Sequence, residues 1–309
     1  MKKLKKKKFV PGCPTHIYQK GYKGRVLFYC VRDRLVYLSI FFDECRRYKV
    51  RVLSIVLMFN HVHATIKVRS EAVRAAFNQA VESRYALIFN QITGRSGPVF
   101  MRTYGWAQKR SDKDVKDNLC YLANNPVVKK LCKRGVDNLW TLLAYGCRRF
   151  PFSEPLLLSR ASRRMRRSVA MVNQCLSQGA LSYQLLNQVF KGLAQKECRQ
   201  LIDHIIQECS TVDYKAAAEY FGGLERMLAA FDVTTGSERE ISEEFIPEPD
   251  GPYAEMAKVM EKEGYDLVEK KFLSPDLDED ERLRLVRLLN EKTKASQRQI
   301  ARFLYLADK

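Results

Sequence analysis

The segment from Val50 to Arg69 constrains the fold most, because two strand patterns follow each other with only a short polar break between them. Val52 to Phe59 is a nearly continuous apolar run, which is typical of a buried strand. From His61 to Val68, polar and apolar residues alternate, so His61, His63, Thr65 and Lys67 share one face of a strand. The opposite face is apolar and belongs in a core. Two neighbouring strands joined at Phe59-Asn60 would place the paired histidines in the middle of a sheet.

The surrounding elements predict the fold class. A strand pattern, or a hairpin about Gly21 to Gly24, lies within residues 16–30, and a helical pattern capped by Asp33 runs to Tyr48. After the two central strands come a helix capped by Ser70 and a strand over residues 99–108. This order predicts an α+β fold of the ferredoxin-like split βαβ type, an antiparallel four-stranded sheet with helices on one face. Its first and third strands form the central pair, and the histidines lie on the open face.

A further helix, starting near Ser111-Asp112, is expected to cover that open face. Its apolar residues Val115, Leu119 and Leu122 form one narrow stripe, and Tyr121 and Asn125 lie one turn apart beside it. Pro126 disfavours helical conformation at Asn125, so we expect the helix to end there. A helix packed in this way would aim a phenol and an amide oxygen at the histidines.

These side chains form a candidate catalytic metal site. His61, His63 and Asn125 would supply two nitrogens and one oxygen, which suits Mg²⁺ or Mn²⁺ with positions left for water or phosphate oxygens. Tyr121 would be the nucleophile, although a phenol attacks a phosphodiester well only if the leaving oxygen is stabilised. Each residue alone also has a plain structural explanation, so the prediction depends on the four acting together.

The charge distribution predicts a polyanionic partner. Residues 1–150 carry 31 Lys and Arg against 9 Asp and Glu, whereas residues 151–309 carry 23 against 26. Nucleic acid is favoured over a membrane surface because no amphipathic lipid-facing helix accompanies the charge. No apolar run approaches the roughly 20 residues of a membrane span. The nine cysteines contain no C-x-x-C pair, which is typical of reduced thiols in a cytoplasm.

Two motifs carry a resemblance to a known family. Val56 to His63 and Tyr121 to Val127 resemble the motifs of the REP-associated tyrosine transposases, which belong to the single-tyrosine HUH nuclease superfamily with the insertion-sequence transposases. Supporting matches are Arg32-Asp33-Arg34, Gly97 to Phe100, and Leu139-Trp140 with Ala144-Tyr145. The resemblance covers about residues 13–150. Phe59 stands where the family usually has proline, and Ala64-Thr65 where aliphatic residues are usual.

The resemblance implies cleavage and joining of single-stranded DNA at or near palindromic hairpins, through a 5′-phosphotyrosine intermediate. It assigns Tyr121 as the nucleophile and His61, His63 and Asn125 as ligands of Mg²⁺ or Mn²⁺. The implied partner is single-stranded or hairpin DNA, the implied place is the bacterial cytoplasm at the nucleoid, and a homodimer stays open. Two alternatives are a catalytically silent hairpin-DNA-binding regulator and a rolling-circle or conjugative HUH nickase.

Charge and aromatic character predict a DNA-binding surface. Cations supply phosphate contacts and exposed aromatic rings stack on unpaired bases. The candidates, besides the basic stretch Lys2 to Lys8, are Arg25, Arg32, Arg34, Arg102, Tyr104, Trp106 and Lys109.

Composition divides the chain into five parts. Residues 1–14 read as a basic arm and residues 15–150 as the HUH-type catalytic domain. Residues 151–232 form a helical region, and residues 233–252 an acidic linker. Residues 253–309 form a helical C-terminal segment, whose end is either part of a helix-turn-helix or a plain amphipathic helix packed on Leu283 to Leu289.

Overall fold

The computed structural model describes residues 8–102, 104–233 and 249–306. The N-terminal half contains β1 (Thr15–Lys20), α1 (Val31–Tyr48), β2 (Arg51–Leu57), β3 (His61–Lys67), α2 (Glu71–Thr93), β4 (Gly105–Gln108) and α3 (Asp112–Val128). Short 3₁₀ turns lie at Tyr22–Gly24, Gly135–Asp137, Leu139–Thr141 and Leu143–Gly146. The C-terminal half is helical, with α4 (Arg163–Gln178), α5 (Tyr183–Phe190), α6 (Gln195–Cys209), α7 (Tyr214–Glu219), α8 (Leu224–Val233), α9 (Gly251–Lys262), a 3₁₀ turn at Lys271–Leu273, α10 (Glu279–Lys292) and α11 (Gln297–Phe303).

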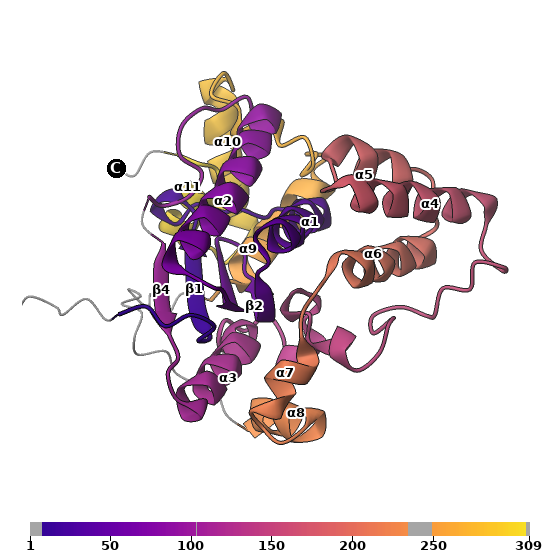
Figure 1. The fold of residues 1–309 in the computed structure, drawn as a ribbon. Coiled ribbons are helices and arrows are strands. Elements are labelled where there is room, and N and C mark those ends of the chain that lie inside the picture. The colour runs from indigo at the N-terminus through magenta and orange to yellow at the C-terminus, as the bar shows by residue number, and fades with distance from the viewer. Residues whose placement is uncertain (1–7, 103, 234–248, 307–309) are drawn as a thin grey trace, which may run out of the picture.

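The four strands form one antiparallel sheet in the order β2-β3-β1-β4 (Figure 1). The predicted α+β fold with a four-stranded antiparallel sheet is confirmed, and β1 and β3 are its central pair. Of the two expectations for residues 16–30, the single strand is correct and the hairpin is wrong. After Lys20 the chain turns, and the backbone amides of Leu27 and Phe28 donate to the carbonyl of Phe59 instead of forming a second strand.

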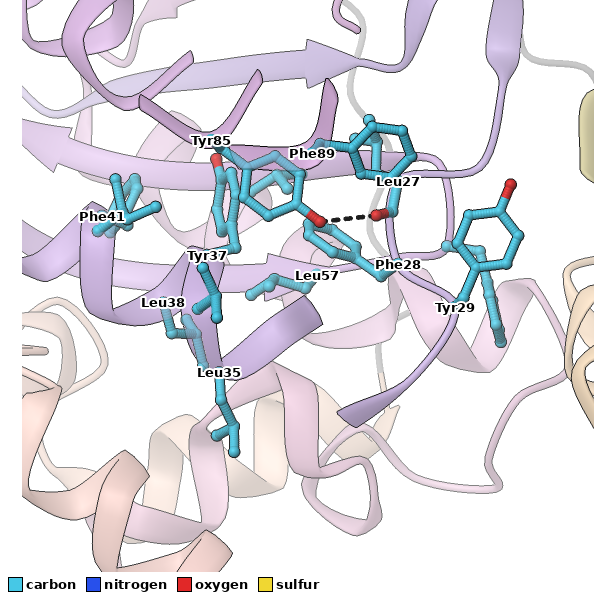
Figure 2. Close-up of a cluster of buried hydrophobic side chains, with 14 of the residues drawn as sticks. Leu27, Phe28, Tyr29, Leu35, Tyr37, Leu38, Phe41, Leu57, Tyr85 and Phe89 are labelled. Atoms are coloured by element: carbon cyan, nitrogen blue, oxygen red, sulfur yellow. Dashed lines mark hydrogen bonds between the residues drawn. The ribbon is translucent and has the colours of Figure 1, made fainter. Parts of the chain in front are cut away.

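Opposite faces of the sheet carry different helices. Ile17 and Ala64 pack against Phe41 of α1 and Phe77 of α2, because alternation sends these residues to one side. Figure 2 shows the adjoining part of this core, where Tyr85 donates to the carbonyl of Leu27 at 2.7 Å. Helix α3 lies across the other face, which is the face that carries the histidines (Figure 1).

Helix boundaries differ from the predictions at two places. Helix α1 begins at Val31 with Cys30 as its N-cap, three residues earlier than expected. Asp33 therefore lies inside the first turn, where it accepts from the backbone amides of Tyr29 and Cys30. Helix α3 continues past Asn125 and contains Pro126. The predicted stripe of Val115, Leu119 and Leu122 is buried in α3, as the spacing indicates.

Helices of the C-terminal half pack against several elements of the N-terminal half. Helices α5 and α6 pack against α1, while α7 and α8 lie against α3 and the 3₁₀ turns that follow it (Figure 1). The last helices return to the N-terminal core. Tyr29 donates to the carbonyl of Phe303 at 2.6 Å, and Tyr305 donates to the carbonyl of Val26 at 2.7 Å. The C-terminal helix α11 is therefore part of the same packed body as β1 and α1, and the acidic linker proposed over residues 233–252 lies mostly outside the described residues.

A buried ion pair joins three distant segments of the chain. The ammonium of Lys270 lies 2.7 Å from a carboxylate oxygen of Asp33, and both side chains are at most 1% exposed. Tyr183 of α5 donates to the same carboxylate at 2.5 Å. Asp33 therefore connects the start of α1, the middle helices and the C-terminal segment.

Candidate active site

The histidine strand β3 lies in the centre of the sheet, as the alternating sequence predicts. His61, His63 and Thr65 point toward α3 and are almost fully buried, with His63 at 0% exposed. Thr65 donates to the amide oxygen of Asn118 on α3 at 2.6 Å, which fixes the helix against this strand. The local fold therefore places the two imidazoles beneath the tyrosine helix.

A third histidine, His16 on β1, belongs to the same cluster and was not predicted. Its Nε2 lies 2.9 Å from Nδ1 of His63, and both rings are fully buried. Tyr18, two residues along β1, stacks on His63 with ring centroids 4.7 Å apart. Alternation along β1 puts His16 and Tyr18 on one face, but only the antiparallel register, with Tyr18 opposite His63, shows which strand they meet.

Tyr121 lies beside the histidines, as the spacing on α3 predicts. Its ring is edge-on to His63 at a centroid distance of 5.3 Å and lies 6.0 Å from the ring of His16. The side chain is partly exposed, whereas the histidines are buried. The structure therefore brings the phenol and the imidazoles together at one place, with the phenol at the solvent side.

Asn125 and Asn60 approach His61 from two elements. The side chain of Asn125, one turn beyond Tyr121, interacts with the His61 ring. Its Oδ1 is buried and makes no hydrogen bond of normal geometry. The Oδ1 of Asn60 lies 2.7 Å from Nδ1 of His61. Because Asn60 Oδ1 can only accept, Nδ1 of His61 carries the proton and its Nε2 has the lone pair.

The electrostatic environment keeps the histidines neutral. Burial lowers the pKa of His61 to about 3, with Lys129 and Lys20 contributing in the same direction. The pKa of His63 is also lowered well below its ordinary value, first by burial and then by His16 and His61. Two lysines thus lie near neutral imidazoles, which is a positive environment for a bound phosphate.

The donor set fits a divalent cation with nitrogen and oxygen ligands. Neutral imidazoles are the form that binds metals, and the buried Asn125 Oδ1 is an oxygen donor that makes no other hydrogen bond. Within the described ranges, no three His, Cys, Asp or Glu side chains form a metal-binding group. A site here would therefore use the asparagine oxygen together with His61 and His63.

Three of the predicted DNA-binding arginines lie over aromatic rings, and one of them is buried. Arg34 is 7% exposed, and its guanidinium carbon lies 4.8 Å from the Phe59 ring and 5.2 Å from the Trp140 ring. Arg32 lies over Phe190 at 5.3 Å. Arg25 lies 4.9 Å from the ring of Tyr305. The burial of Arg34 does not support a phosphate contact, because its charge is enclosed by rings.

The remaining candidates lie at the β4 edge. Arg102 is exposed, whereas Lys109 is 4% exposed. Tyr104 and Trp106 face Arg74 of α2, whose guanidinium carbon is 4.1 Å from the Trp106 ring, so they lie on the sheet face opposite the histidines. Their placement does not support base stacking beside Tyr121. The predicted contacts of Lys2 to Lys7 lie outside the described residues, and Lys8 is exposed.

Comparisons with known proteins give one distant structural similarity. No family model and no curated protein matches the sequence. A solved structure described as the REP associates tyrosine transposase bound to a REP hairpin resembles the chain with a TM-score of 0.40 and 12% identity, over 52% of this chain and 98% of that one. A similarity this distant establishes neither family nor activity. In the part of the chain that the structure describes, no helix is both long and apolar enough to cross a bilayer.

Proposed function

We propose that this protein is a metal-dependent DNA transesterase of the HUH type, which cleaves and joins single-stranded DNA with Tyr121 as the nucleophile. The observation that carries the proposal is the placement of the Tyr121 ring 5.3 Å from His63, at the solvent side of a buried histidine cluster. A nucleophile of this kind must be reachable by a DNA strand, while the groups that act on the phosphate must be held rigidly.

The proposed reaction exchanges one phosphoester bond for another. The Tyr121 oxygen attacks phosphorus and loses its proton, the bond to the 3′ oxygen breaks, and that oxygen leaves as a 3′-hydroxyl. The products are a 5′-phosphotyrosine and a free 3′ end. Attack by a second 3′-hydroxyl reverses the step and joins the strands, so no high-energy cofactor is consumed.

His61, His63 and Asn125 would hold Mg²⁺ or Mn²⁺, which when bound stabilises charge on the phosphate and the leaving oxygen. The protein contributes the preorganisation of these ligands. Asn60 fixes the His61 ring by accepting from Nδ1, and His63 is positioned by the hydrogen bond between its Nδ1 and Nε2 of His16. Lys20 and Lys129 add positive charge where the phosphate would lie.

The substrate and context extend the proposal beyond the site. The resemblance of the two motifs to the transposase family favours single-stranded DNA next to a palindromic hairpin. The sheet order β2-β3-β1-β4 supports the proposal that the core is of the ferredoxin-like split βαβ type. Cytoplasmic localisation at the nucleoid and a homodimer stay predictions from the sequence. A rolling-circle nickase and a regulator without chemistry are the alternatives that an experiment must separate.

A covalent adduct assay tests the proposal. The full-length protein is incubated with a hairpin oligonucleotide that carries labelled single-stranded flanks and with Mg²⁺ or Mn²⁺, and the products are separated under denaturing conditions. We expect a labelled protein band that Tyr121→Phe abolishes while hairpin binding stays close to that of the wild type. Tyr48→Phe is the matched control, because Tyr48 is a partly exposed tyrosine that contacts Phe77 on the other side of the sheet.

Three outcomes contradict parts of the proposal. Binding of the hairpin without any adduct favours the regulator. An adduct that survives Tyr121→Phe assigns the nucleophile to another residue. Cleavage that requires no hairpin favours a nickase.

A further inference from the structure

A second basic site lies away from the histidine cluster, where the C-terminal segment meets the N-terminal core. A cavity of about 210 Å³ lies between the loop after α2 and the segments around α10 and α11. Its lining includes Arg95, Leu273, Ser274, Pro275, Arg282 and Tyr305. Most of these residues come from the C-terminal half, beyond the part of the chain that carries the transposase motifs.

Two arginines line this cavity, and a third, Arg25, lies over the Tyr305 ring that forms part of its wall. Arg95 and Arg282 line it, and the guanidinium carbons of Arg95 and Arg25 lie 5.3 and 4.9 Å from the same Tyr305 ring. The ring face attracts both cations, and the buried ring keeps its position through the hydrogen bond to Val26. Burial lowers the pKa of Arg95, and the nearby charges of Arg25 and Arg282 act in the same direction.

The acidic residues that the structure describes form no ion pair with these arginines. Among residues 8–102, 104–233 and 249–306, no Asp or Glu lies within ion-pair distance of Arg25, Arg95 or Arg282, and Arg95 and Arg282 instead donate to backbone carbonyls. Glu281, next to Arg282 in the chain, pairs with Arg284 and accepts from Tyr265. Clustered guanidinium groups without acidic partners are typical of a site for an anion, and their planar donor arrangement matches phosphate oxygens.

We propose that this cavity binds a backbone phosphate of a nucleic acid strand. A cavity of about 210 Å³ is smaller than the roughly 300 Å³ at which small-molecule sites begin, so it fits one phosphate with part of its sugar and not a cofactor. Guanidinium groups from the α2 loop and from α10 would hold that phosphate between the two halves of the chain.

The location connects the cavity to the proposed active site. β1 ends at Lys20, whose charge contributes to lowering the pKa of His61. The following loop carries Lys23 and then Arg25, which lies over the Tyr305 ring in the cavity wall. Asn60, beside His61, also donates to the carbonyl of Gly24 in this loop. Cations thus follow one loop from the histidines to the cavity, and a strand cleaved at Tyr121 would have its flank held there. This part of the inference rests on the proposed function.

The salt dependence of binding tests the phosphate contact. Full-length protein carrying Tyr121→Phe, which prevents cleavage, is titrated with a fluorescent hairpin oligonucleotide with single-stranded flanks over a series of NaCl concentrations. Removing one phosphate contact lowers the slope of log affinity against log salt by roughly 0.7 for single-stranded DNA. We expect this loss for Arg282→Gln and for Arg95→Gln, and we expect Arg282→Lys, which keeps the charge, to retain the slope.

Arg167→Gln is the matched control, because Arg167 is an exposed arginine on α4, and its slope should equal that of the parent. A slope unchanged in Arg282→Gln refutes the proposal, as does an equal loss in Arg167→Gln. If Arg95→Gln does not fold, the comparison of Arg282→Gln with Arg282→Lys tests the phosphate contact. The two proposals can fail separately. If Arg282→Gln lowers the slope but the wild type forms no adduct, the phosphate site is supported and the proposed chemistry is refuted. If the wild type forms an adduct but Arg282→Gln leaves the slope unchanged, only the phosphate site is refuted.

Discussion

Replacement of Asp33 by Asn should cause a large loss of stability, although Asp33 lies outside the candidate active site. Its carboxylate is fully buried, 2.7 Å from the Lys270 ammonium, and it accepts from Tyr183 at 2.5 Å and from the amide of Tyr29 at 2.6 Å. Asn keeps the size and the acceptor for the amide, but it leaves the Lys270 charge without its counterion. The substitution therefore removes the charge of the ion pair and the acceptor for the Tyr183 hydroxyl while keeping the acceptor for the backbone amides.

The distances set the size of the effect. At 2.7 Å and an effective dielectric constant of about 20, the attraction between the two charges is about 6 kcal/mol, much of it offset by desolvation of both groups. Removing one partner of a buried pair costs about 3–5 kcal/mol, because the other charge stays buried. We expect Asp33→Asn to lower the free energy of unfolding by that amount. Lys270→Met should cost less, about 1–3 kcal/mol, because Tyr183 and two backbone amides still donate to the carboxylate.

Denaturant unfolding followed by circular dichroism measures these values. Because the ion pair joins α1, α5 and the C-terminal segment, the loss should appear in one cooperative transition, and the Asp33→Asn/Lys270→Met double variant should be less destabilised than the sum of the single variants. A cost below about 1 kcal/mol for Asp33→Asn, or strict additivity in the double variant, would refute the reasoning.

Three further predictions concern the sheet and the site. Burial raises the pKa of Glu82 to about 7, so the stability that its protonated form contributes is present below about pH 4.5 and is lost as the pH rises through about 7. The free energy of unfolding of Glu82→Gln should exceed that of the wild type by up to about 3 kcal/mol at about pH 9 and equal it near pH 4. Equal free energies of the two proteins at both pH values would contradict the raised pKa. A Cβ on Gly135 would lie 2.1 Å from the carbonyl oxygen of Ala123 on α3. Gly135→Ala should therefore lower the free energy of unfolding by about 1–3 kcal/mol, and with it the melting temperature and the adduct yield. An unchanged melting temperature would exclude this clash. His16→Phe should reduce the rate of adduct formation and the affinity for Mn²⁺ about 10–100-fold, and His16→Gln, which keeps a polar partner for His63, should recover part of both. A rate equal to that of the wild type would show that His16 does not position His63.

Local patterns in the sequence determined the elements that build the site. Strict alternation from His61 to Val68 required a strand with the histidines on one face, and the apolar stripe of α3 required a helix with Tyr121 and Asn125 beside it. These periodicities depend only on neighbouring residues, so they can be read without a structure. The element order then placed the histidine strand in the middle of an antiparallel sheet.

Only the tertiary structure decided which distant residues share a site and which charges reach solvent. His16 meets His63 through strand register, and register depends on the pairing of segments 47 residues apart. Arg34 reads as a surface cation in the sequence, but the folded chain encloses it between Phe59 and Trp140. The sequence shows how many cations a segment carries. Whether each cationic side chain is buried depends on all the elements packed around it. The surface that could face DNA therefore follows from the fold and not from composition.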